Sequence, residues 1–130
     1  MEFVSIRVIT ENVARLADFY EKVTGVPAER LNDDFAELVT SYGTLAIGST
    51  RTAPAAIRPG ENRSVIIEFR VDDVDAAYRD LAGFVSPEQE PTTMPWGNRS
   101  LLFHDPDGNL VNLFTPVTPA AIERFSRRSR

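Results

Sequence analysis

The 130-residue sequence contains no cysteine, a single histidine and a single tryptophan. Without cysteine the chain has no disulfides, no thiolate metal site and no thiol nucleophile. It also lacks an apolar run long enough to span a membrane, and it begins at once in a strand pattern, with no signal peptide. We therefore expect a cytoplasmic protein that does not bind a membrane.

Positive charge is scarce in the body of the chain, and the formal net charge of the whole sequence is −5. An acidic body argues against a nucleic-acid partner. Basic residues crowd only the C-terminus, at Arg124, Arg127, Arg128 and Arg130. We interpret this basic tail as a solvated helix end and a frayed terminus, with a binding patch as the alternative. The apolar fraction of 42% and the charged fraction of 25% are ordinary for a globular chain.

The most informative stretch is a hairpin near the C-terminus. Residues 105–109 read Asp-Pro-Asp-Gly-Asn, in which proline presets φ, glycine supplies a positive φ, and Asp and Asn side chains bond back to the backbone. Apolar-rich runs of strand length, 99–103 and 110–114, lie on either side. An earlier stretch, 35–47, has the same layout around Gly43. The sequence therefore predicts two hairpins.

A strand followed by a helical pattern precedes each hairpin. Residues 7–13 resemble residues 70–74, so the chain reads as two copies of one unit: strand, helix, then three strands. This layout predicts an α+β fold of two βαβββ modules. We place the first module at 1–48, a linker at 49–63, the second module at 64–115 and a C-terminal helix or tail at 116–130, all in one domain.

Local signals in the first module define a strand and a helix. Residues 2–9 alternate, and we expect the aliphatic side chains of Val4, Ile6 and Val8 to lie under helices. Thr10 is the expected N-cap of a helix over 11–24, which Gly25 terminates.

The second module carries similar signals. Asp72 or Asp73 caps a short helix, and three prolines limit 84–95 to an edge strand or an irregular segment. Pro119 begins a last helix, with Ile122 and Phe125 as its apolar anchors.

The duplicated layout resembles the vicinal oxygen chelate superfamily, which includes glyoxalase I, bleomycin-resistance proteins and extradiol dioxygenases. The motifs that carry the resemblance are Asn12-Val13 with Phe19-Tyr20, Val71-Asp72-Asp73-Val74, and the block from Trp96 to Leu110. The resemblance implies curved mixed sheets around a ligand cavity, with helices on the outer faces. It also implies a homodimer, in which a cavity forms either within one chain or between two.

Enzymes of this superfamily hold a divalent metal with His and Glu side chains. The matching positions in this chain are Ser5, Ile66, Asn112, and Ala46 or Ile47. None of these residue types is a normal ligand for such an ion, so we expect no metal and no other cofactor. The one histidine, His104, has no partners for a metal site, and we interpret it as a strand-end residue bonded locally.

Strand alternation puts polar and apolar side chains together on mixed faces. Arg7 and Glu68 form either a structural ion pair or a polar pair that orients a ligand, and both roles are compatible. Trp96 either packs over the edge of the second module or stacks on a planar or cationic ligand, and Arg99 beside it suits an anionic group. The expected ligand-binding residues are Ser5, Arg7, Ile66, Glu68, Trp96, Arg99, Leu110, Asn112 and Phe114.

These features predict a small-molecule binding protein of the bleomycin-resistance type. It would sequester an apolar or aromatic compound, such as an antibiotic, without metal and without chemistry. The alternative is a lyase, isomerase or dioxygenase with a displaced divalent metal site, or with metal-free acid–base catalysis by Glu68, the only catalytic candidate. A third hypothesis is a structural or regulatory dimer whose cavity is vestigial.

Overall fold

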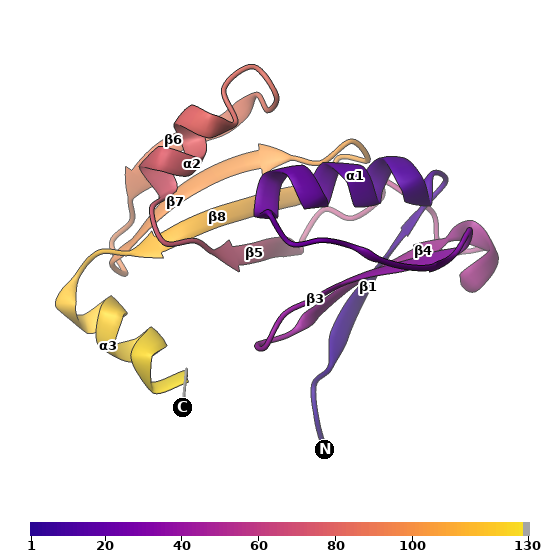
Figure 1. Cartoon of the computed structure of the whole chain (residues 1–130), viewed down its shortest axis with the longest axis horizontal. Coiled ribbons are helices and arrows are strands. Elements are labelled where there is room, and N and C mark those ends of the chain that lie inside the picture. The colour runs from indigo at the N-terminus through magenta and orange to yellow at the C-terminus, as the bar shows by residue number, and fades with distance from the viewer. Residues whose placement is uncertain (129–130) are drawn as a thin grey trace. The chain divides into compact units, whose positions relative to one another are not determined.

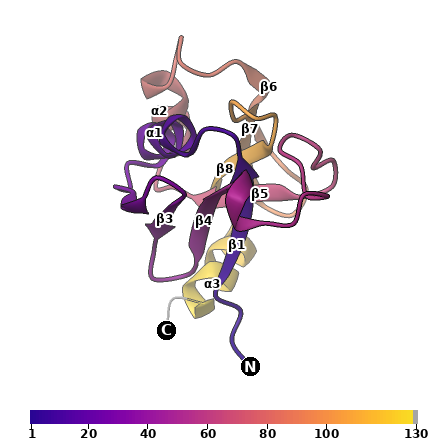
Figure 2. The same cartoon turned by 90° about the vertical axis from the view of Figure 1, so that its right-hand side faces the viewer.

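The computed structural model describes residues 1–128, in which two four-stranded sheets are accompanied by three α-helices (Figures 1 and 2). The predicted α+β fold of two βαβββ modules is confirmed. Residues 129 and 130, which include Arg130 of the basic tail, lie outside the described residues. None of the helices within residues 1–128 has the length and apolar character needed to cross a membrane.

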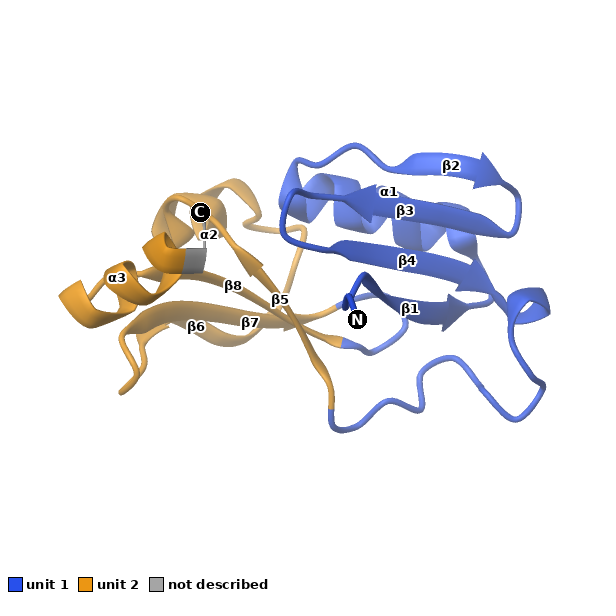
Figure 3. Cartoon of the chain, turned by 90° about the horizontal axis from the view of Figure 1, so that it is seen from below, with its two compact units in different colours: residues 1–64, 105–109 blue, residues 65–104, 110–130 orange. Residues whose placement is uncertain are grey.

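The chain divides into two compact units (Figure 3). Unit 1 contains residues 1–64 together with 105–109, and unit 2 contains residues 65–104 and the chain from 110 onward. The turn of the C-terminal hairpin is therefore part of unit 1, while both of its strands belong to unit 2. Sequence periodicity places this turn in the second module, because periodicity reports local pairing and not the tertiary contacts of the turn.

Unit 1 holds the first βαβββ motif, and its sheet has the strand order β1-β4-β3-β2. Strand β1 is parallel to β4, and the other neighbours are antiparallel. A short 3₁₀ turn, η1, follows β4. The elements are β1 (Ser5–Thr10), α1 (Val13–Thr24), β2 (Glu29–Asn32), β3 (Phe35–Val39), β4 (Thr44–Ser49) and η1 (Thr50–Thr52).

Helix α1 begins two residues later than its sequence predicts. Asn12 is the N-cap, and its side-chain oxygen accepts a hydrogen bond of 3.0 Å from the Arg15 backbone N–H. The predicted cap, Thr10, is instead the buried last residue of β1, where its hydroxyl accepts a bond from the Asn12 N–H. Thr10 as N-cap was wrong because the strand extends through this residue. At the other end Gly25 adopts φ 72°, the left-handed conformation expected of a helix-terminating glycine.

Helix α1 packs on β3 and β4, the central strands of the sheet, and leaves β1 uncovered (Figure 3). Its buried side chains, among them Leu16 and Tyr20, meet the apolar face of those strands, where Leu38 and Ile47 are fully buried. The expectation that the aliphatic face of β1 lies under a helix was wrong in part, since Ile6 remains 42% exposed. The reason is that β1 is an edge strand, and one helix covers only the two strands beneath it.

Unit 2 holds the second motif, with the strand order β5-β8-β7-β6. The predicted edge position of the proline-rich segment is confirmed by β6, which also shows register shifts against β7. Asp73 caps α2, and its carboxylate accepts from the Ala76 N–H. The elements are β5 (Ile66–Arg70), α2 (Val74–Asp80), β6 (Pro87–Thr93), β7 (Asn98–His104), β8 (Leu110–Pro116) and α3 (Pro119–Arg128).

The last helix, α3, begins at Pro119 as predicted and lies against β8. The Phe125 ring lies 5.2 Å from the Phe114 ring, centroid to centroid. Ile122, the other predicted anchor, is exposed, and Ala121 is buried in its place. That prediction was wrong because α3 turns Ala121, not Ile122, toward Gly97. The approach is close: a Cβ added to Gly97 would lie 2.9 Å from the Ala121 Cβ.

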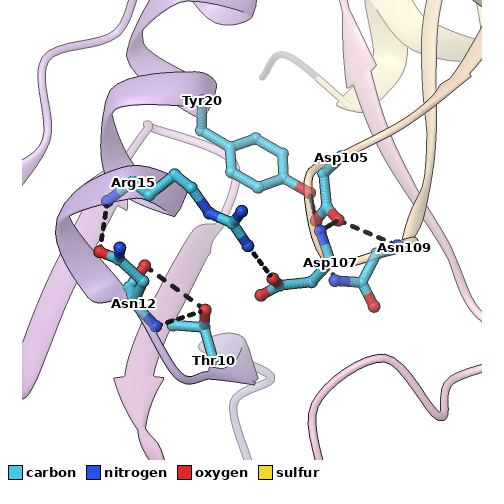
Figure 4. Close-up of polar contacts among 7 residues, drawn as sticks. All are labelled: Thr10, Asn12, Arg15, Tyr20, Asp105, Asp107 and Asn109. Carbon is cyan, nitrogen blue, oxygen red and sulfur yellow. Dashed lines mark hydrogen bonds and ion pairs between the residues drawn. The ribbon is translucent and has the colours of Figure 1, made fainter.

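The 105–109 turn is bound into unit 1 by polar contacts with α1, of which one is buried (Figure 4). The Tyr20 hydroxyl donates a 2.7 Å hydrogen bond to the Asp105 carboxylate, which also accepts from the backbone and side chain of Asn109. Arg15 pairs with Asp107 at 2.9 Å. Burial, reinforced by the neighbouring Asp105 carboxylate, raises the pKa of the Tyr20 phenol well above its ordinary value. The phenol therefore stays protonated and keeps donating throughout the physiological pH range.

Candidate functional site

The face of the first sheet that points away from α1 carries a mixture of charged, small and apolar side chains. We call it the open face of the first sheet. Strand alternation puts Ser5, Arg7 and Ile9 of β1 on this face, and the strand register aligns them with β4 and β3. One row across the sheet reads Arg7, Ala46, Glu37, because Ala46 pairs with both of the others.

This face bears a hollow with a volume of about 360 Å³. Strands β1, β3 and β4 form its floor, and residues 53–57 of the predicted linker form one wall. Its lining combines aliphatic, aromatic, acidic and basic side chains. The lining residues are Ser5, Arg7, Ile9, Phe35, Glu37, Ala46, Ala53, Pro54 and Ile57. Two predicted site residues, Ser5 and Arg7, therefore lie in one hollow.

Residues 53–57 are held beside the sheet by an anchor at their N-terminal side. The Ser49 hydroxyl and the Arg51 guanidinium each donate a 2.7 Å hydrogen bond to the Asp34 carboxylate. The Ser49 hydrogen bond, followed by the Arg51 contacts, lowers the pKa of Asp34 below its ordinary value. The wall of the hollow is thus tied to the sheet by side-chain bonds that sequence periodicity does not reveal.

Gly48 makes room for this arrangement in the floor. An added Cβ would collide with the Thr52 hydroxyl and would lie 3.3 Å from the Arg7 Cδ. Because Gly48 has no side chain, η1 after β4 can fold back over the sheet. The aliphatic part of Arg7 also passes over β4 at Gly48.

The hollow contains two opposite charges, Arg7 and Glu37, that have no ion pair with any other described residue of unit 1. Two other arginines of unit 1 are already paired, Arg51 with Asp34 and Arg58 with Glu61. Sequence reasoning missed Glu37. Strand alternation could have identified Glu37 as a site residue. The apolar residues Ala36 and Leu38 on either side of it are buried, so Glu37 points to the opposite face of the sheet.

The second sheet also has an open face, which we define as the face that points away from α2. Its predicted site residues pair across β5 and β8, Ile66 with Leu110 and Glu68 with Asn112. Phe114, also on this face, contacts Phe125 of α3. The Glu68 carboxylate accepts a 2.9 Å hydrogen bond from the Asn112 side-chain amide. Because an amide does not titrate, this contact supplies Glu68 with no second acid or base.

Three buried polar atoms on this second open face have no hydrogen-bond partner among the residues of unit 2 that the structure describes. They are the side-chain oxygens of Asn98 and Asn112 and the Ser100 hydroxyl. Ser100 pairs with Phe114, so it lies diagonally across the ladder from Asn112. Sequence reasoning did not single out Ser100, since a lone serine in an apolar strand carries no distinguishing pattern. These atoms form a cluster of buried polar groups within unit 2.

The remaining predicted site residues of unit 2 lie elsewhere. Arg99 is on the helix-covered face of the second sheet, where its guanidinium donates to both oxygens of Asp75 in α2. It is therefore engaged in a structural ion pair that also lowers the pKa of Asp75. Trp96 is 57% exposed, which contradicts the packed alternative.

His104 ends β7, with its Nδ1 3.8 Å from the Glu88 carboxylate. Phe103 is fully buried and His104 is exposed, so the two side chains lie on opposite faces of β7.

The donor set does not fit a divalent metal. In the first sheet the candidate positions are Ser5 and Ala46, since Ile47 is buried under α1. In the second sheet they are Ile66 and the Asn112 amide. Hydroxyl, methyl, aliphatic and amide groups supply no imidazole or carboxylate for the ion. Within residues 1–128, moreover, no three His, Cys, Asp or Glu residues are grouped so that they could hold an ion.

Comparison with known proteins assigns the family. A model of the Glyoxalase/Bleomycin resistance protein/Dioxygenase superfamily matches residues 2–113. The chain belongs to this superfamily. The resemblance inferred from the motifs is thereby confirmed. No curated protein matches the chain.

Several solved structures have the same fold. A protein of unknown function from Agrobacterium tumefaciens is 26% identical, with a TM-score of 0.76, and the match covers 88% of this chain and 94% of that one. A structure described as a conserved domain protein is also 26% identical, with a TM-score of 0.75 and coverage of 89% and 99%.

A glyoxalase/bleomycin resistance protein/dioxygenase from Nocardioides is 19% identical, with a TM-score of 0.73 and coverage of 92% and 85%. At this identity the likeness concerns the fold alone. The expected homodimer and the Arg7–Glu68 pair stay predictions.

Proposed function

We propose that this member of the superfamily is a small-molecule binding protein. It holds an organic compound with an apolar or aromatic body against the open face of the first sheet, without a metal and without chemistry. The observation that supports this function is the hollow of about 360 Å³. Its volume lies within the range of about 300–1,000 Å³ that is typical of small-molecule sites.

The lining of the hollow suits such a ligand. Ile9, Phe35 and Ile57 offer apolar contact area, and Arg7 and Glu37 offer directional polar contacts. A few polar groups within an apolar wall are the usual basis of orientation and specificity in ligand sites. Ala46 at the floor leaves space for the ligand, because its methyl group occupies little of the hollow.

Ligand screening tests the proposal. A panel of planar aromatic compounds, antibiotics included, is added to the protein, and thermal unfolding and backbone amide NMR shifts are measured. A ligand present at a hundredfold excess over its Kd raises the free energy of unfolding by about 2.7 kcal/mol. We expect at least one compound to raise the melting temperature and to shift amides of β1, β3 and β4.

A matched pair of variants locates the binding. Ala46→Leu places a larger side chain in the hollow, whereas Thr44→Leu makes a comparable enlargement on the same strand and face but outside the lining. We expect Ala46→Leu to abolish the ligand-induced shift and Thr44→Leu to keep it. Loss in both variants, or in neither, would contradict binding in this hollow.

Elemental analysis tests the metal-free part of the proposal. The protein is dialysed against Ni²⁺, Zn²⁺, Mn²⁺ and Fe²⁺ and desalted before the metal content is measured. We expect a stoichiometry near zero for every ion, because the donor positions supply neither imidazole nor carboxylate. About one ion per chain would overturn the metal-free proposal and favour the enzyme alternative.

A further inference from the structure

We propose that the ligand of this hollow is a small zwitterion with an apolar middle, whose anionic end binds Arg7 and whose cationic end binds Glu37. This inference rests on the proposed function and adds the chemical class of the ligand. It starts from the row Arg7, Ala46, Glu37 that crosses the floor of the hollow.

The two charges are separated in a way that favours a bridging ligand. Neighbouring strands lie about 4.8 Å apart, so the Cα atoms of Arg7 and Glu37 are about 10 Å apart with β4 between them. Only the methyl group of Ala46 stands in the intervening position. A short aliphatic or aromatic segment fits over this methyl group, while polar groups at its two ends reach the neighbouring strands.

The charge distribution around the hollow sets the orientation of the ligand. Glu29 of β2 pairs with Glu37 of β3, so the carboxylate side of the row carries two acidic residues. Arg7 stands alone on the opposite side, because Arg51 and Arg58 are engaged with their own carboxylates. The β1 side of the hollow therefore attracts an anion, and the β3 side attracts a cation.

The lack of internal partners for both charges supports the same conclusion. Within unit 1, neither the Arg7 guanidinium nor the Glu37 carboxylate has an ion pair or hydrogen bond. Glu37 is half-buried in the floor of the hollow, among apolar and polar lining residues. A charged group at such a position gains free energy from an oppositely charged hydrogen-bonding partner, and a ligand amine supplies one.

Linear ω-amino carboxylates test this inference, because they carry one charge at each end of a methylene chain. The probes are ω-aminohexanoate and its matched analogues hexanoate, which lacks the amine, and hexylamine, which lacks the carboxylate. Binding is measured from backbone amide NMR shifts of β1, β3 and β4. We expect ω-aminohexanoate to bind about tenfold more tightly than either analogue, which corresponds to one additional charge-assisted contact.

Single substitutions assign each end of the ligand. Arg7→Gln should reduce the affinity for ω-aminohexanoate to about that for hexylamine, and Glu37→Gln should reduce it to about that for hexanoate. Arg58→Gln is the matched control, because it removes the same charge from an arginine that is paired with Glu61 and does not line the hollow. We expect this control to keep the wild-type preference.

The possible failures are distinguishable. Equal binding of all three probes, or an equal loss for all three in Arg7→Gln, would overturn the zwitterion and leave the two charges as solvated groups. If the zwitterion does not bind but an aromatic compound binds and Ala46→Leu blocks it, only this inference fails. If neither class binds, the proposed function fails with it.

Discussion

At the scale of single residues, Asp34 links the wall of the hollow to its floor. Its carboxylate accepts hydrogen bonds from Ser49 at the end of β4 and from Arg51 in η1. The same contacts lower its pKa, so they stabilise the charged form. Because residues 53–57 follow directly after η1, the charge of Asp34 helps to set the position of one wall of the ligand site.

The lowered pKa of Asp34 predicts how this anchor depends on pH. The stabilisation is fully present above the unfolded-state pKa and is lost as the pH falls through the lower folded-state pKa. Asp34→Asn should therefore lower the melting temperature at pH 7, and the difference from wild type should shrink below about pH 4. Thermal unfolding monitored by circular dichroism from pH 2 to pH 8 measures this.

Asp33→Asn is the matched control, because Asp33 is adjacent and exposed and has no ion pair with the residues that the structure describes. Its melting temperature should follow the wild-type pH profile. A pH-independent difference between Asp34→Asn and wild type would show that the anchor does not depend on the charge of Asp34.

At the scale of elements, the start of α1 depends on a single side chain. Asn12 accepts from the Arg15 N–H, whereas Thr10 ends β1 and bonds to the backbone of Asn12. Both residue types are good N-caps, so local sequence does not distinguish them. The position is decided by β1, whose parallel pairing with β4 continues through Thr10.

The N-cap predicts a stability difference. Asn12→Ala should reduce the free energy of unfolding by about 1 kcal/mol, because one N–H group at the helix start loses its acceptor. Chemical denaturation with unchanged m-value measures this loss. Asn12→Asp is the control, since aspartate also accepts this bond and its negative charge is favourable at a helix N-terminus. A loss of the same size in Asn12→Asp would contradict the capping role.

At the scale of the whole molecule, unit 1 is assembled from two separate stretches of the chain. Residues 105–109 belong to it, although β7 and β8 on either side belong to unit 2. Three hydrogen bonds to the Asp105 carboxylate, from Asp107 and from the backbone and side chain of Asn109, shape the turn, and a fourth, from Tyr20 of α1, ties it to unit 1. Because the chain is continuous through the turn, we expect the two units to unfold together.

Removal of one hydroxyl tests this coupling. Tyr20→Phe deletes the bond to Asp105 and should lower the free energy of unfolding by about 1–2 kcal/mol. The readout is the fluorescence of Trp96, the only tryptophan, which lies in unit 2 while Tyr20 lies in unit 1. We expect the Trp96 midpoint in denaturant to shift with the circular dichroism midpoint. An unchanged Trp96 midpoint beside a shifted dichroism signal would show that the units unfold independently.

The sequence by itself determined the repeated βαβββ pattern, the superfamily, the hairpin at 105–109 and the edge position of the proline-rich strand. The superfamily followed from the resemblance of its motifs to known members. The other features depend on local chemistry, because turn residues and side-chain alternation act over a few neighbouring positions. Local alternation also placed Ser5 and Arg7 on the same face of their strand, and the structure puts both in one hollow.

Only the tertiary structure decided which residues surround that hollow. Strand pairing places Glu37 and Arg7 in one row on either side of β4. Residues 53–57 form a wall because Asp34 binds Ser49 and Arg51. The sequence predicts that Arg99 binds an anionic group of a ligand, but its guanidinium is paired with Asp75 on the helix-covered face of the second sheet. These contacts join residues that are distant along the chain, and their partners depend on strand order and register, which side-chain alternation does not specify.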